Sequence, residues 1–153
     1  MLSKPVYGWS DFQLDGTSVY ALSYLTDIAM NWLDQAIHGL ETRMPFCVKG
    51  NLEPNRFLCI VSYWNCYILC EDIDRYPLNK EKISYELSHT SMLQFCKILY
   101  QDIYQNLSEW ISFLDNEDDD LENRKKVLCQ KLKDLHELIS QREEDFGEHR
   151  FFF

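Results

Sequence analysis

The sequence predicts an α+β fold in which an antiparallel sheet of four to five strands is covered by an N-terminal helix and a C-terminal helical hairpin. Apolar residues recur at helical spacing between residues 26 and 44, short β-rich segments occupy residues 45–88, and a longer helical pattern follows residue 91. Because the connections between successive strands are short, the sheet should be an antiparallel meander. No Gly-, Ser- or Pro-rich linker interrupts the chain, so residues 1–153 are expected to form a single domain.

The N-terminal segment is expected to contain one short edge strand and one helix. The strand should lie around residues 12–14 and be followed by a turn through Gly16. Helical spacing of apolar residues begins after Thr26, with Thr26 or Asp27 as the N-cap. The helix should end before Pro45, because proline has no amide hydrogen to donate and biases the preceding residue toward an extended conformation.

The middle of the chain has the alternation and composition of β-strands. The segments PFCVKGNL, RFLCIVSYW and CYILCEDI are rich in β-branched and aromatic residues, with a tight break near Asn65. In KISYELS, the apolar Ile83, Tyr85 and Leu87 alternate with polar residues, so this strand is expected to be half-buried with its apolar face inward. Both faces of the hairpin 57–73 are apolar, which predicts either a sheet covered on two sides or a homodimer or docking surface on one side.

Three of the six cysteines, Cys59, Cys66 and Cys70, lie in this hairpin, and alternation places them on one side of the sheet. Cys66 and Cys70 should be about 13 Å apart at ~3.3 Å per residue, which is too far for a single zinc ion to bridge easily. In one register around Asn65, Cys59 faces Cys70 and the pair can oxidise, whereas in the next register Cys70 faces Val61. The sequence favours buried, reduced thiols that act as small apolar side chains.

The C-terminal part of the chain predicts two long helices. Ser91 and Gln94 have the spacing of a capping box, and apolar residues from Met92 to Leu114 then recur every three or four positions. A second helix is expected from about Leu121 onward. Its apolar stripe is narrower, so it should pack on the preceding helix as a helical hairpin.

The chain is acidic, with a formal net charge of −10. Nucleic acid and an anionic membrane surface are disfavoured as partners, since both attract Lys and Arg, whereas a basic protein would be attracted at long range. The candidate docking residues for such a partner are Asp118, Asp119, Asp120 and Glu122. Alternatively, these residues begin the last helix and complement its dipole. A calcium loop is not predicted, because Asp120 stands where its turn requires Gly.

No pattern in the sequence predicts a cofactor, a metal or a catalytic residue. Dinucleotide-binding, P-loop, nucleophile-elbow and H-E-x-x-H motifs are missing. Glu86 and His89 have Glu-x-x-His spacing, but metal sites of that type require a second copy of the motif. With no export signal or membrane span apparent, the cysteines are expected to stay reduced in a cytoplasm. The rival hypothesis is a small enzyme or ligand-binding protein that uses a cysteine or histidine in a pocket.

The stretches SYLTDIAMNWLDQAI and LEPNRFLCIVSY resemble segments of small acidic bacterial proteins that act as immunity partners of toxins. The resemblance extends over the first two thirds of the chain and includes no diagnostic motif and no functional residue to transfer. It implies a stoichiometric binder that neutralises a toxin by covering it. Together with the net charge and the missing motifs, the resemblance leads to the expectation of a non-catalytic, cytosolic protein-binding domain.

Overall fold

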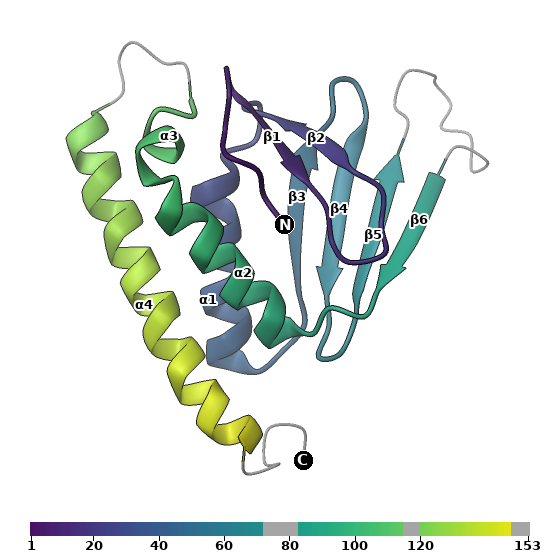
Figure 1. Ribbon diagram of the computed structural model, residues 1–153, viewed down its shortest axis with the longest axis vertical. Helices are drawn as coiled ribbons and strands as arrows, with labels where there is room; N and C mark the ends of the chain where they lie inside the picture. The colour runs from purple at the N-terminus through teal and green to yellow at the C-terminus, as the bar shows by residue number, and fades with distance from the viewer. Residues whose placement is uncertain (72–82, 115–119, 148–153) are drawn as a thin grey trace.

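The computed structural model describes residues 1–71, 83–114 and 120–147, which form two antiparallel sheets and four helices (Figure 1). The small sheet pairs β1 (Trp9–Phe12) with β2 (Tyr20–Ser23). The large sheet contains β3 (Phe46–Asn51), β4 (Arg56–Val61), β5 (Cys66–Glu71) and β6 (Ile83–Ser88) in that order. The helices are α1 (Ile28–Thr42), α2 (Met92–Gln105), α3 (Leu107–Ile111) and α4 (Leu121–Gly147). The predicted α+β layout and the four-stranded meander are confirmed.

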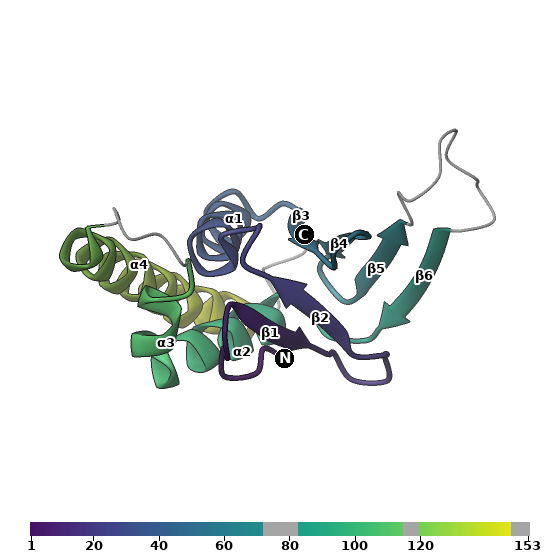
Figure 2. The same ribbon diagram turned by 90° about the horizontal axis from the view of Figure 1, so that it is seen from above.

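The large sheet has one covered face, which we call the inner face, and one face that no described element covers, which we call the outer face. The β1–β2 hairpin lies over the inner face, where the ring of Tyr20 is centred 5.2 Å from that of Phe57. Helix α2 contacts the same face through Phe95, whose ring centroid lies 5.8 Å from that of Phe46. Helix α4 packs against α1 and α2 rather than against the sheet (Figure 1). Figure 2 shows the helices gathered at one end of the molecule, with β5 and β6 extending away from them.

Trp32 of α1 is fully buried where the hairpin, the sheet and α2 meet. Its ring centroid lies 5.4 Å from that of Phe12, 6.2 Å from that of Phe57 and 6.2 Å from that of Phe95. Its Nε1 donates a hydrogen bond of 2.7 Å to the backbone carbonyl of Lys49 in β3. Helix α1 therefore lies along the β3 edge of the large sheet.

The predicted N-terminal helix is confirmed, with Asp27 as its N-cap. The Asp27 side chain accepts a hydrogen bond from the amide of Met30, and the helix ends at Arg43, ahead of Pro45. Gly39 faces the sheet near the end of this helix. A β-carbon at this position would lie only 2.2 Å from Cδ1 of Phe46, so the glycine permits α1 to approach β3 closely.

Replacing Gly39 with alanine is expected to lower the free energy of unfolding by ~1–3 kcal/mol. Alanine has the higher helix propensity by about 1 kcal/mol, but the added methyl group would have to displace α1 or the buried ring of Phe46. Urea unfolding monitored by circular dichroism measures the change. The matched control is Gln35→Ala on the exposed side of α1, which should change stability by less than about 0.5 kcal/mol. A Gly39→Ala variant as stable as that control would contradict the close packing.

Two expectations for the N-terminal half and the central hairpin are wrong in detail. The expected edge strand near residues 12–14 lies at Trp9–Phe12 and pairs with β2 in the separate small sheet. The break near Asn65 is a four-residue loop, closed by a hydrogen bond of 2.9 Å from the amide of Ser62 to the carbonyl of Asn65. Neither expected register is therefore present, and Cys59 lies opposite Ile68.

The predicted helical hairpin is present, although its first helix is interrupted. The capping box of Ser91 and Gln94 is confirmed at the start of α2. At Asn106 the backbone leaves helical geometry, so α3 is a separate short helix that buries Trp110. Helix α4 packs against α1 as well as α2, and its apolar residues Leu128, Leu132, Leu135 and Ile139 are buried.

The apolar side chains of strand β6 lie on the opposite face of the sheet from the one predicted. Ile83, Tyr85 and Leu87 lie on the outer face, where they are 40, 79 and 48 % exposed. The polar residues of the strand lie on the inner face, where Ser88 is 1 % exposed and donates a hydrogen bond of 2.9 Å to the carbonyl of Asp15. The prediction failed because polar groups of the β1–β2 hairpin cover this end of the inner face.

Candidate functional site

An exposed apolar surface extends over the outer face of β4, β5 and β6. Strand pairing places Ile60 beside Tyr67 and Leu87, and it places Leu58 beside Leu69 and Tyr85 in the next row. We call these six residues, together with Ile83, the outer-face patch. Directly opposite residues in antiparallel strands share a face, so the patch is contiguous from β4 to β6. The alternative of a sheet covered on both sides is not met within the described residues, since Ile60 and Tyr67 on the outer face are 38 and 45 % exposed.

Charged residues lie only at the borders of the outer face as it is described. Lys49 stands on β3 at one side, and Arg56 lies opposite Glu71 at the end of the strands. Two positive charges and one negative charge leave the described outer face with a net charge of +1, so the negative charge of the chain, −10 in total, lies on other parts of it. An apolar centre with a polar rim is the usual anatomy of a protein-binding surface.

Glu86 connects the inner face of β6 to the β1–β2 hairpin. Its carboxylate accepts hydrogen bonds from the Tyr20 hydroxyl and from the backbone amide and hydroxyl of Ser18. The hydrogen bond from Tyr20 lowers the pKa of Glu86, and burial of the ring raises the pKa of Tyr20. These contacts keep the polar side of β6 against the hairpin and thereby direct Ile83, Tyr85 and Leu87 outward.

Substituting Tyr20 with phenylalanine is expected to raise the pKa of Glu86 toward its ordinary value. The folded pKa is lower than the unfolded one, so this contact stabilises the fold above the ordinary pKa of a glutamate. The contribution is lost as the pH falls through the lowered value. Carboxyl chemical shifts followed through an NMR titration measure the pKa directly. Ser18→Ala should raise it less, and an unchanged pKa in the Tyr20→Phe variant would refute the assigned cause.

Of the acidic residues predicted to dock a partner, the described Asp120 and Glu122 are not part of the outer face. Asp118 and Asp119 lie outside the described residues. Asp120 caps α4, because its carboxylate accepts a hydrogen bond of 3.0 Å from the amide of Asn123. Glu122 lies in the first helical turn, where its charge complements the helix dipole. This end of α4 is at the far side of the molecule from β6 (Figure 1).

The central cysteines are buried thiols rather than a reactive cluster. Cys59, Cys66 and Cys96 are fully buried, which confirms the prediction for the first two. The hydrogen bond between the thiols of Cys59 and Cys66 raises the pKa of Cys59, and burial raises the pKa of Cys96. The thiols of Cys59 and Cys96 are therefore protonated at neutral pH and are poor nucleophiles. Cys70 is only half-buried, and Cys129 is exposed.

A cysteine and a histidine do line one cavity, of about 230 Å³, between α2 and α4. Cys129 and His136 are seven residues apart on α4, which corresponds to about 10 Å along a helix at 1.5 Å per residue. They cannot form a nucleophile–base hydrogen bond at this separation. The imidazole of His136 instead packs on the ring of Tyr100, with the centroids 5.0 Å apart.

Glu86 and His89, whose spacing resembles a metal-binding motif, are held by different partners. Nδ1 of His89 forms a hydrogen bond of 2.8 Å with the side-chain oxygen of Asn65, while Glu86 binds the hairpin. Within residues 1–71, 83–114 and 120–147, no group of three or more His, Cys, Asp and Glu side chains could hold a metal ion.

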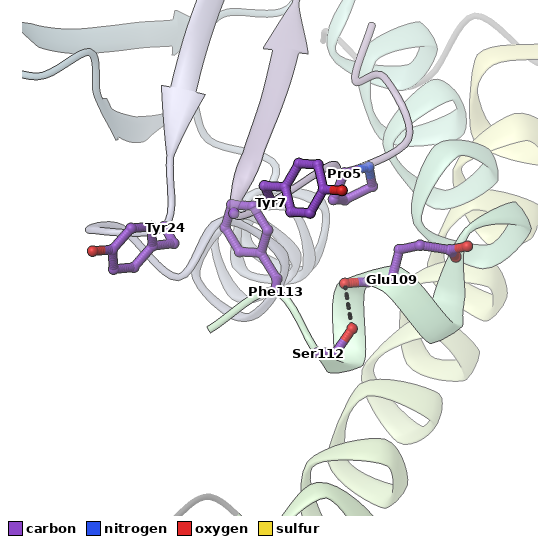
Figure 3. A pocket seen from close by; sticks show the side chains of 7 residues that line it. Pro5, Tyr7, Tyr24, Glu109, Ser112 and Phe113 are labelled. Carbon is purple, nitrogen blue, oxygen red and sulfur yellow. Dashed lines mark hydrogen bonds between the residues drawn. The ribbon is translucent and has the colours of Figure 1, made fainter. Parts of the chain in front are cut away.

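A second recess, of about 300 Å³, lies between the N-terminal turn and α3 (Figure 3). Tyr7 and Tyr24 stand at its sides, and the backbone of Tyr7 has a positive φ of 50°. Figure 3 shows the carboxylate of Glu109 directed away from both rings. Hydrogen bonds from Lys4 and Ser108 lower the pKa of Glu109 to about 2, so the carboxylate is ionised but already paired. Among the described residues that line the recess, no nucleophile is hydrogen-bonded to a side-chain base.

The outer-face patch is therefore the candidate site, and the sequence identified four of its seven residues. Leu58, Ile60, Tyr67 and Leu69 were expected on a second apolar face, whereas the residues of β6 were expected to point inward.

The helices of the described part of the chain include none with a stretch suited to crossing a membrane. Comparison with protein-family models, curated proteins and solved structures finds no match for this chain.

Proposed function

We propose that this chain is a non-catalytic protein-binding domain that docks a partner protein on its outer-face patch. The supporting observation is the orientation of β6, which exposes Ile83, Tyr85 and Leu87 in continuity with the apolar residues of β4 and β5. Exposing these side chains to water is unfavourable, by about 25 cal/mol for each Å² of apolar surface. Contiguous apolar surface with a polar rim is the feature that marks interaction sites on soluble proteins.

The preferred partner is a basic protein in the same cytoplasm. The net charge of −10 attracts a positively charged body at long range and accelerates association, while the outer-face patch supplies the short-range contacts. The more specific form of the proposal is an immunity protein that neutralises a basic toxin by covering it. That form predicts growth arrest when the partner is expressed alone and recovery when this chain is expressed with it.

Tyr67→Lys is expected to weaken partner binding by roughly 30-fold or more, since removing a central aromatic contact typically costs about 2 kcal/mol. The purified native and variant chains are immobilised and exposed to an extract of the producing cells to identify the partner. Titration of each chain with that partner then gives the affinity. The matched control is Tyr104→Lys, because Tyr104 is a 60 % exposed tyrosine on α2. Loss of binding in the control but not in Tyr67→Lys would place the interface elsewhere and refute the proposal.

The rival hypothesis of an enzyme or ligand-binding protein makes a different prediction. An activated thiolate would react rapidly with a charged thiol reagent at neutral pH, whereas protonated buried thiols would not. We expect the exposed Cys129 to react at the rate of an ordinary thiol, and Cys59 and Cys96 to react only after unfolding. A fast-reacting cysteine in the folded chain would favour the rival function.

A further inference from the structure

We propose that β6 pairs in antiparallel orientation with β6 of a second copy, joining two four-stranded sheets into one of eight strands. The inference goes beyond the proposed function, because it concerns the edge of the sheet rather than its face. Such a contact has twofold symmetry, the commonest symmetry of protein dimers. The two outer-face patches would then form one continuous surface.

The two edges of the large sheet differ in their availability. The β3 edge is occupied by α1, whose Trp32 side chain donates to the Lys49 carbonyl. Strand β6 pairs with β5 on one side, and no other described residue forms a backbone hydrogen bond with it. Figure 2 shows β6 at the end of the molecule that is remote from the helices. An antiparallel partner can therefore approach β6 without displacing any described element.

Strand β6 contains no lysine, no proline and no β-bulge, which are among the features that prevent edge pairing. Its six residues, ISYELS, contain neither lysine nor proline. Its register with β5 is continuous from Ile83 to Ser88, so it has no bulge. Its single charged residue, Glu86, lies on the inner face and is bound by Tyr20 and Ser18.

Symmetry and charge select one register for the pairing. Directly opposite residues must share a face, so the twofold axis passes between the two copies of one residue. Most of the strand is paired only if that residue is Tyr85 or Glu86. An axis at Glu86 would place two carboxylates opposite each other, which is destabilising. An axis at Tyr85 pairs the two Tyr85 side chains, places Ile83 opposite Leu87 twice, and places Ser84 opposite Glu86. The structure therefore favours the register centred on Tyr85.

The dimer should be weak, and its dependence on salt should distinguish it from the partner complex. Pairing of one short edge strand is a small interface, in the class of transient contacts. Two chains of net charge −10 repel each other, so added salt should strengthen the dimer. Added salt should weaken the complex with a basic partner, so the two associations respond in opposite directions.

Cysteine cross-linking tests the register in a chain whose exposed Cys129 is replaced by serine. With the axis at Tyr85, thiols introduced by Tyr85→Cys lie directly opposite each other, with Cβ atoms ~4.5–5.5 Å apart. We expect this variant to form a disulfide-linked dimer under mild oxidation at least tenfold faster than Ser84→Cys or Leu87→Cys, measured by non-reducing electrophoresis and mass spectrometry. Equal rates at the three positions, or a faster rate at 84 or 87, would overturn the register.

The oligomeric state of the native chain tests the pairing itself and does not depend on any variant. Sedimentation or light scattering should show a dimer whose population rises with concentration and with salt, and Tyr85→Lys should abolish it. Ile60→Lys is the matched control, because Ile60 lies on β4, two strands from the edge. Loss of the dimer in Ile60→Lys but not in Tyr85→Lys would indicate stacking of the outer faces and refute edge pairing. A monomer under all conditions would also refute it, while leaving partner binding to the Tyr67→Lys test.

Discussion

Replacing Arg124 with methionine is expected to destabilise the protein by about 2–4 kcal/mol, because the substitution removes a buried guanidinium and leaves the partly buried carboxylate of Asp27 without its partner. The guanidinium of Arg124 binds the carboxylate of Asp27 with two hydrogen bonds of 2.7 and 3.0 Å. It also donates to the carbonyls of Trp110 at 3.0 Å and Ile111 at 2.9 Å. One side chain of α4 thus connects the start of α1 to the end of α3.

Urea unfolding of three further variants isolates the ion pair. Arg124→Lys keeps the charge but cannot reproduce the bidentate geometry, so it should recover only part of the loss. Combining Arg124→Met with Asp27→Asn should cost less than the sum of the two single changes, since the double variant leaves no unpaired charge. Lys125→Met, at the next and exposed position, is the control and should change stability by less than about 0.5 kcal/mol. Additive effects of the two single changes would show that the pair is not coupled.

Trp32→Ala is expected to cost about 3–5 kcal/mol in the free energy of unfolding, the range found when large buried aromatic residues are truncated. The ring is fully buried among Phe12, Phe57 and Phe95, which belong to three different elements, so the cavity cannot close by moving one of them. The loss would weaken contacts among the hairpin, the sheet and α2 at once. Chemical denaturation followed by circular dichroism measures the effect.

A conservative variant separates the packing of Trp32 from its hydrogen bond. Trp32→Phe retains an aromatic ring but removes the donor to the Lys49 carbonyl, which should cost about 1–3 kcal/mol if that carbonyl stays buried. Asn31→Ala, an exposed change in the adjacent position of α1, provides the control. If Trp32→Phe is as unstable as Trp32→Ala, the hydrogen bond to β3 rather than the packing holds α1 in place.

The elements with local signals were predicted closely, and those that depend on distant partners were not. The N-cap at Asp27 and the capping box of Ser91 and Gln94 each involve residues a few positions apart, so the sequence displays them directly. Strand β2 carries no comparable pattern, and it exists because it pairs with β1 and covers Phe57. The break at Asn106 was also missed, because the apolar spacing continues through it.

The candidate site was predicted only in part for the same reason. Alternation along β4 and β5 revealed two apolar faces, but it could not show which face the rest of the chain would cover. The acidic residues around Asp120 were predicted to dock a partner because of their charge. In the structure, Asp120 caps a helix and Glu122 lies in its first turn, far from the sheet. A patch of exposed apolar residues has no signature of its own, because the same side chains would serve equally well in a core.

The sequence by itself determined the fold class, the order of the strands in the large sheet and the position of α1, because periodicity, caps and short connections are local properties of the chain. Only the tertiary structure decided which side of β6 faces the solvent. That choice is made by Tyr20 and Ser18, which lie 66 and 68 residues away from Glu86 and bind its carboxylate. A strand with one polar and one apolar side can bury either one, and here the hydrogen-bonding partners on the inner face select the polar side.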